Sequence, residues 1–112
     1  MSISLSQKDQ VIKCFNLLVK HFIKDKSLHS KIQILFQEQS IEGVSFYENG
    51  NYHSCFWDKD FKSLEFLYEV VSHEFTHVYF LVIEGHHSHN DRFFSYAEFF
   101  LAWLKGKINS EN

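Results

Sequence analysis

The sequence has no proline and only four glycines among its 112 residues, so few positions can interrupt a helix or a strand. Gly43, Gly50, Gly85 and Gly106 are therefore the main candidates for breaks between elements. Between them the chain must form long continuous segments, whose type follows from the spacing of the apolar residues. The length allows one hydrophobic core, so residues 1–112 are predicted to form a single domain.

Two long segments carry apolar residues at the three- and four-residue spacing of an amphipathic helix. The first covers residues 6 to about 26, and the second runs from about residue 61 to residue 84. Asp58 or Asp60 is placed to cap the start of the second helix. Gly85 is placed to end it, because glycine readily adopts the left-handed conformation that follows many helices.

A third helix is predicted near the C-terminus. Residues 88–91, Ser-His-Asn-Asp, match a capping box, in which an acidic side chain follows a serine by three positions. Apolar residues then recur at helical spacing, and the basic, glycine-containing residues 105–107 are expected to end the helix.

Three strands are predicted between the first two helices. Residues 32–36 begin with apolar and polar side chains in alternation, which is typical of a strand. Residues 44–47 and 52–57 are rich in β-prone residues and flank Asn49-Gly50, a strong hairpin signal. The order of helix, three strands, helix and helix predicts a small α+β domain.

Composition limits the classes of function. Apolar residues make up 45% of the chain and aromatic residues 18%, which is enough for a packed core. The net charge is −3 and no run of Lys or Arg is present, so nucleic-acid binding through a basic face is not supported. Cys14 and Cys55 form no CxxC pair and are expected to be buried thiols. The chain shows neither a signal-peptide pattern nor an apolar run of ~20 residues, so we expect a cytoplasmic protein with no membrane span.

The motif that carries chemistry is His73-Glu74-Phe75-Thr76-His77, inside the second predicted helix. A spacing of four residues puts both imidazoles on one face of a helix, where two nitrogens can bind one ion. Zinc in such a site lowers the pKa of its bound water toward ~7, and a neighbouring carboxylate can take the proton. The motif therefore predicts zinc held by His73 and His77, with Glu74 as the general base.

A catalytic zinc usually has a third protein ligand. We favour His89, because the capping box would place it in the first turn of the last helix, where its side chain can point back at the motif. His86 and His87 lie in the preceding turn and remain alternatives, as does Glu98 on the last helix.

At these residues the sequence resembles the SprT-like family of zinc metallopeptidases. That family pairs a His-Glu-x-x-His helix with a third histidine about a dozen residues on, followed by an aromatic residue, as His89 is here followed by Phe93. The hairpin in residues 46–53 also looks like the strand pair that precedes the family's helix. The resemblance implies a minimal zincin-like domain that hydrolyses peptide bonds, with His73, His77 and His89 as zinc ligands and Glu74 as the base. Family members are implicated in proteolysis of DNA-bound proteins, a role that the charge of this chain does not support.

Several other interpretations remain open. A minimal gluzincin, or a protease similar to the ImmA/IrrE-like proteases, would use Glu98 as the third zinc ligand. A catalytically silent zincin-fold module would use zinc for stability and bind a partner. A metal-free helical interaction domain would leave the histidines without a common role. For the peptidase we expect a protein or peptide substrate, bound by pairing with a sheet edge, and a partner that recruits the substrate is possible.

Overall fold

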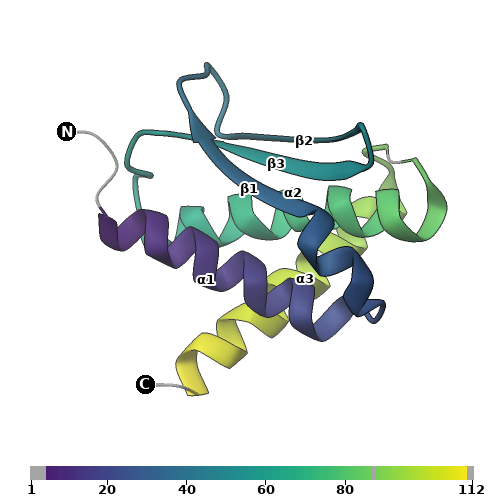
Figure 1. The fold of residues 1–112 in the computed structure, drawn as a ribbon. Helices are drawn as coiled ribbons and strands as arrows, with labels where there is room; N and C mark the ends of the chain where they lie inside the picture. Colours follow the sequence, from purple (N-terminus) through teal and green to yellow (C-terminus); the bar gives the residue numbers. More distant parts are fainter. Residues whose placement is uncertain (1–4, 87, 111–112) are drawn as a thin grey trace.

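The computed structural model describes residues 5–86 and 88–110, and its order of long helices and strands matches the predicted one, with a short 3-10 helix added after the first helix (Figure 1). The elements are α1 (Leu5–Phe22), the 3-10 helix η1 (Lys26–Lys31), β1 (Ile32–Gln37), β2 (Gly43–Glu48), β3 (Asn51–Trp57), α2 (Leu64–Glu84) and α3 (Asp91–Ser110). Helices and a small three-stranded sheet together confirm the α+β class.

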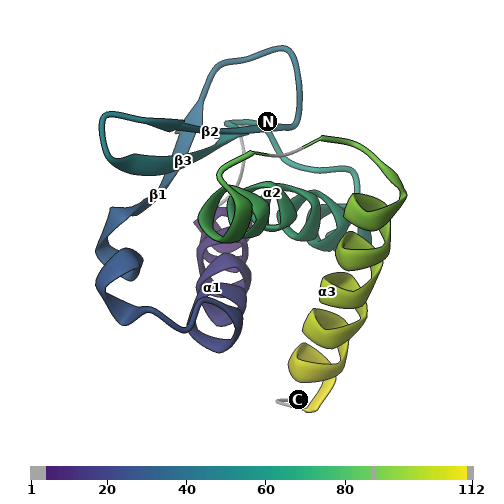
Figure 2. The same cartoon turned by 90° about the vertical axis from the view of Figure 1, so that its right-hand side faces the viewer.

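The sheet forms one layer, and the three long helices lie on one side of it (Figure 1). Figure 2 shows α2 in the middle of the helical layer, with α1 on one side and α3 on the other. Helix α2 contacts α1, α3, β2 and β3, so it is the central element of the fold. No helix in the described part of the chain is long and apolar enough to cross a bilayer.

Strand β3 is the central strand of the sheet, parallel to β1 and antiparallel to β2. The β2–β3 hairpin turns at Asn49 and Gly50, whose φ angles of 52° and 84° are those that a two-residue hairpin loop requires. The predicted turn is therefore confirmed. Strand β2 is left as an edge strand, and Ser45 in β2 lies opposite Ser54 in β3.

Aromatic rings join the layers into one core. The Phe15 ring of α1 meets the Phe56 ring of β3 edge to face at 6.1 Å and the Phe75 ring of α2 at 5.8 Å. Phe75 in turn meets Phe100 of α3 at 4.9 Å. Because these four side chains are at most 1% exposed, the apolar faces of three helices and the sheet are buried against one another.

Cys14 and Cys55 are both buried thiols, as expected from the sequence.

The predicted start of α2 was wrong. The helix begins at Leu64 rather than residue 61, and Ser63, not Asp58 or Asp60, is its N-cap, accepting a hydrogen bond from the Phe66 N–H. Phe61 is held outside the helix, because its side chain is buried and its N–H donates to the Gln7 side chain at 2.9 Å. Packing against α1 therefore decides where α2 begins.

The predicted end of α1 was also wrong. Helix α1 ends at Phe22 rather than about residue 26, and η1 follows with Asp25 as its N-cap. The Asp25 carboxylate accepts a hydrogen bond from the Ser27 N–H at 3.0 Å, and the His29 ring lies 2.8 Å from the Ile23 carbonyl. These contacts satisfy an N–H at the start of η1 and the carbonyl just after α1, in the segment that leads to β1.

Candidate metal centre

Helix α2 carries two of the three candidate ligands and the candidate base. It is bounded by the Ser63 cap and by Gly85, whose N–H donates to the Leu81 carbonyl and whose φ of 78° turns the following chain out of the helix. Within this helix His77 is buried and His73 is half-buried. The helix is packed on most sides, so both imidazoles project from a rigid backbone.

The structure brings the Nε2 atoms of three histidines together. Nε2 of His73 lies 3.2 Å from that of His77 and 3.2 Å from that of His89, and the His77–His89 separation is 3.0 Å. Two nitrogens bound to one zinc ion at ~2.0–2.1 Å with tetrahedral angles lie about 3.3 Å apart. The three nitrogens are therefore spaced as ligands of one metal ion would be.

Hydrogen bonds alone cannot account for this arrangement. Each neutral imidazole Nε2 either donates one hydrogen or accepts one, so three such atoms cannot satisfy all three short contacts at once. Three protonated rings would repel one another. A shared cation satisfies all three lone pairs, so the donor set fits a metal ion.

The predicted alternatives for the third ligand are not part of this cluster. Among the residues that the structure describes, His73, His77 and His89 form the one group of three possible ligands that lie close enough to hold an ion. His86 and Glu98 are exposed and lie outside that group. His87 lies outside the described residues.

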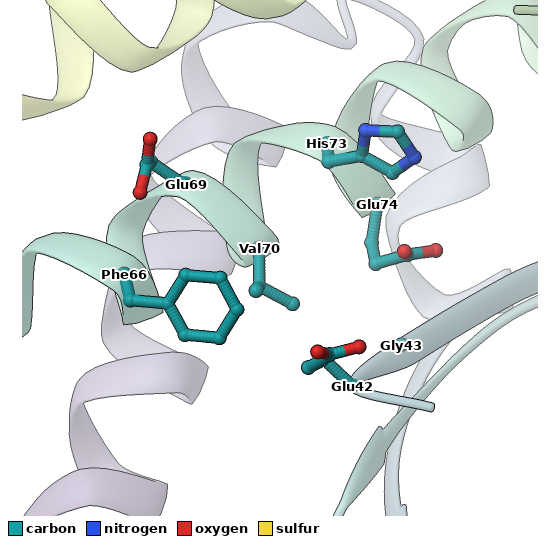
Figure 3. A pocket seen from close by; sticks show the side chains of 7 residues that line it. All are labelled: Glu42, Gly43, Phe66, Glu69, Val70, His73 and Glu74. Atoms are coloured by element: carbon teal, nitrogen blue, oxygen red, sulfur yellow. The ribbon is translucent and has the colours of Figure 1, made fainter. Parts of the chain in front are cut away.

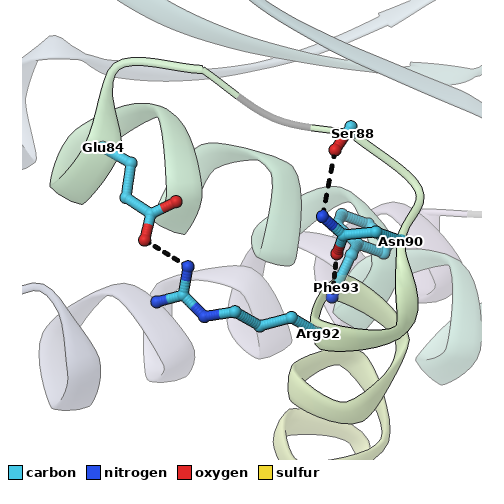
Figure 4. A network of polar contacts seen from close by, with 5 residues as sticks. All are labelled: Glu84, Ser88, Asn90, Arg92 and Phe93. Atoms are coloured by element: carbon cyan, nitrogen blue, oxygen red, sulfur yellow. Dashed lines mark hydrogen bonds and ion pairs between the residues drawn. The ribbon is translucent and has the colours of Figure 1, made fainter.

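His89 reaches the cluster from a position that the sequence analysis did not predict. Helix α3 begins at Asp91, and Asn90 rather than Ser88 caps it, because the Asn90 Oδ1 atom accepts a hydrogen bond from the Phe93 N–H at 2.9 Å (Figure 4). His89 therefore lies in the loop just before the helix, not in its first turn.

The α2–α3 loop is fixed at both ends. Arg92 in the first turn of α3 forms an ion pair with Glu84, the last residue of α2 (Figure 4). The Asn90 side chain also donates to Ser88 Oγ at 3.2 Å. These contacts tie the end of α2 to the start of α3 and so limit the positions that His89 can adopt.

The Phe93 side chain packs against the three histidines. Its ring is fully buried, and its centroid lies 5.0 Å from that of His73, 4.5 Å from that of His77 and 5.0 Å from that of His89. One rigid ring thus contacts all three imidazoles. From the sequence, Phe93 was singled out only as the aromatic residue that follows His89 in the family resemblance.

Glu74 points toward the sheet and is only 4% exposed. Ser45 Oγ donates a hydrogen bond to Glu74 Oε1 at 2.7 Å. Burial raises the pKa of Glu74 to about 7, although the hydrogen bond from Ser45 acts in the opposite direction. Sequence reasoning missed Ser45, since a serine 29 positions away on a strand carries no local signal of this contact.

A cleft of about 350 Å³ opens beside His73 and Glu74 (Figure 3). Phe66 and Val70 of α2 contribute apolar lining, and Glu42 and Gly43 form the side nearest the sheet. The complete lining consists of Glu42, Gly43, Phe66, Glu69, Val70, His73 and Glu74. The candidate base and one candidate ligand therefore face the same open space.

Burial, and secondarily the charge of His89, lower the pKa of His73 below its ordinary value. A lowered pKa favours the neutral imidazole, which is the form that binds a metal ion. The site thus combines three histidines, of which His73 is biased toward its metal-binding form, with one carboxylate that can hold a proton. This combination is suited to activating a water molecule.

No protein-family model, curated protein or solved structure matches the chain.

Proposed function

We propose that the protein is a zinc-dependent peptidase, with His73, His77 and His89 as the zinc ligands and Glu74 as the general base. The observation that carries the proposal is the convergence of the three Nε2 atoms, at separations of 3.0–3.2 Å, next to a buried glutamate on the same helix. The resemblance of the motif and its downstream histidine to the SprT-like family supports the same assignment. Bound zinc acts as a Lewis acid that activates water and polarises a carbonyl.

Glu74 supplies the proton transfers. Its carboxylate lines the cleft together with His73, so it is placed to take a proton from a water molecule that enters there. The same carboxyl group then protonates the leaving amine, which completes hydrolysis of the peptide bond. Phe66 and Val70 make another part of the cleft apolar.

Strand β2 is the proposed binding edge for an extended substrate. It is an edge strand, and Gly43 at its start lines the cleft. A peptide that pairs with this edge through main-chain hydrogen bonds would pass beside His73 and Glu74. Substrate selection by main-chain pairing requires no particular sequence, which suits a peptidase that acts on unfolded segments.

Substitution of Glu74 tests the proposal. Protein purified without a histidine tag is expected to contain about one zinc ion per chain. It should hydrolyse members of an internally quenched decapeptide library of random sequence, and Glu74→Gln should retain the zinc while losing about 10²- to 10⁴-fold in turnover. Glu65→Gln, an exposed carboxylate in the first turn of α2, serves as the matched control and should behave as the wild type.

Two outcomes would contradict the proposal. Zinc-loaded wild-type protein without turnover of any library peptide would favour the silent zinc-binding module. Equal turnover by the wild type and Glu74→Gln would remove Glu74 from the reaction.

A further inference from the structure

Strand β2 contacts the Glu74 side chain at two positions on one face. Ser45 Oγ donates to Glu74 Oε1 at 2.7 Å and lies 3.4 Å from the Glu74 carbonyl oxygen. Two residues earlier, a Cβ atom added at Gly43 would lie only 2.8 Å from both Cγ and Oε2 of Glu74. Residues two apart in a strand face the same way, so both contacts come from the face of β2 that covers α2.

A second buried hydroxyl lies beside the first. Ser54 Oγ on β3 lies 2.8 Å from Ser45 Oγ, and Ser45, Ser54 and Glu74 are all buried. A serine hydroxyl has one hydrogen, and the shorter, charge-assisted bond to Glu74 Oε1 uses that of Ser45. Ser54 therefore donates to Ser45, and the chain of hydrogen bonds runs from Ser54 to Ser45 to Glu74.

The two contacts leave the two carboxylate oxygens in different surroundings. Oε1 is occupied by Ser45, whereas no hydrogen bond from a described residue reaches Oε2. The carboxylate lies between the His73 ring and the chain at Glu42 and Gly43 in the close view of the cleft (Figure 3). Gly43 provides the space for the side chain, because any larger residue there would overlap it.

We infer that Ser45 and Gly43 are positioning residues that hold Glu74 in one rotamer, with Oε1 bound to the sheet and Oε2 left to exchange the proton. The expected effect on catalysis rests on the proposed peptidase function. The orientation of the Glu74 side chain does not depend on that function and can be measured by itself. A general base works only within hydrogen-bond reach of its proton, and a displacement of about 1 Å can cost about 10²-fold in rate. A glutamate has three rotatable bonds, so an unanchored Glu74 would sample several positions.

The primary test measures the Glu74 rotamer in the zinc-loaded full chain, by the three-bond Hα–Hβ and Hβ–Hγ couplings in NMR spectra. The wild type should give the couplings of one rotamer, and Ser45→Ala should give averaged values. Ser45→Thr keeps the hydroxyl and should restore the wild-type couplings. Ser54→Ala removes a neighbouring buried hydroxyl while leaving the Ser45–Glu74 bond, so it should also resemble the wild type.

Kinetics give a second readout that a purely structural role would not move. Ser45→Ala should lower kcat about 10- to 100-fold with KM unchanged, and Ser45→Thr should recover most of the loss. Gly43→Ala should shift the Glu74 couplings and lower kcat, because the added methyl group displaces the side chain. If Ser45→Ala does not fold, the Glu74 couplings in Gly43→Ala decide whether β2 positions Glu74.

Three results would overturn the inference: wild-type couplings in Ser45→Ala or in Gly43→Ala, failure of Ser45→Thr to restore them, or an unchanged kcat in Ser45→Ala. A wild-type protein that binds zinc but hydrolyses no peptide would refute the peptidase proposal alone. The couplings would then still decide whether β2 positions Glu74.

Discussion

At the scale of single residues, the three histidines depend on side chains that do not bind metal. Phe93 places one buried aromatic ring against all three imidazoles, with centroid separations of 4.5–5.0 Å. Packing against Phe93 restricts the rotamers of the three imidazoles even without a metal ion. The candidate ligands are therefore already oriented for metal binding. Residues that orient metal ligands typically affect metal affinity without touching the ion.

Phe93→Leu tests this support. Leucine keeps an apolar side chain in the core but lacks the flat ring face, so we expect a loss of stability of about 1 kcal/mol. Zinc affinity should fall about tenfold, because the imidazoles gain freedom. Phe100→Leu is the matched control: this ring is equally buried on the same helix, but its ring contacts are with Phe22, Phe75, Tyr79, Tyr96 and Phe99. It should lose similar stability and keep its zinc affinity, as measured by competition titration and thermal denaturation.

At the scale of elements, the α2–α3 connection determines whether the metal centre is complete. Helix α2 supplies two candidate ligands from one face, and the third candidate is the residue before the Asn90 cap of α3. The start of α3 therefore also holds His89 in position. A change that frays this helix end should move the ligand, whereas a change at the start of α2 should not, because Ser63 lies ten residues before His73.

Two cap substitutions separate these effects. Asn90→Ala and Ser63→Ala each remove a side-chain acceptor at a helix start, and each is expected to cost about 1 kcal/mol of stability. Asn90→Ala should also weaken zinc binding severalfold, and Ser63→Ala should leave it unchanged. Equal zinc affinity in both variants, measured with a chromophoric chelator, would show that the cap does not support His89.

At the scale of the whole molecule, the centre connects parts of the fold that are far apart in the sequence. The ligands join α2 to the segment before α3, and the hydrogen bond of Glu74 to Ser45 joins α2 to the sheet. A metal ion that binds the folded chain and not the unfolded one stabilises the fold by mass action. Metal binding should therefore be visible in the stability of the entire domain.

Metal removal tests this coupling. With free zinc at about 1,000 times the dissociation constant, the folded state should gain about 4 kcal/mol. Addition of EDTA should therefore lower the Tm of the wild type by about 15 °C. His89→Ala, which retains the helix but lacks the third ligand, should show a much smaller response. A wild-type Tm that is insensitive to both zinc and EDTA would argue for the metal-free interaction domain.

Much of the architecture followed from local patterns. The helical spacing of apolar residues, the Asn49-Gly50 turn and the stop at Gly85 identified the long helices and the hairpin, since each depends on a few neighbouring residues. Helix boundaries were less predictable. Gly106 lies inside α3, where a glycine costs about 1 kcal/mol relative to alanine. The buried Leu104 and the partly buried Ile108, packed against the core on either side of it, favour continuing the helix.

The sequence by itself determined the pairing of His73 with His77, because a four-residue interval on a helix places two side chains on one face whatever surrounds them. It also narrowed the third ligand to a few candidates and favoured His89, although it placed His89 inside the last helix rather than before it. Only the tertiary structure brought His89 to that pair and placed Ser45 and Gly43 against Glu74. Those contacts join residues 12 to 31 positions apart, so they depend on how α2 packs against the sheet and against α3, which local patterns do not specify.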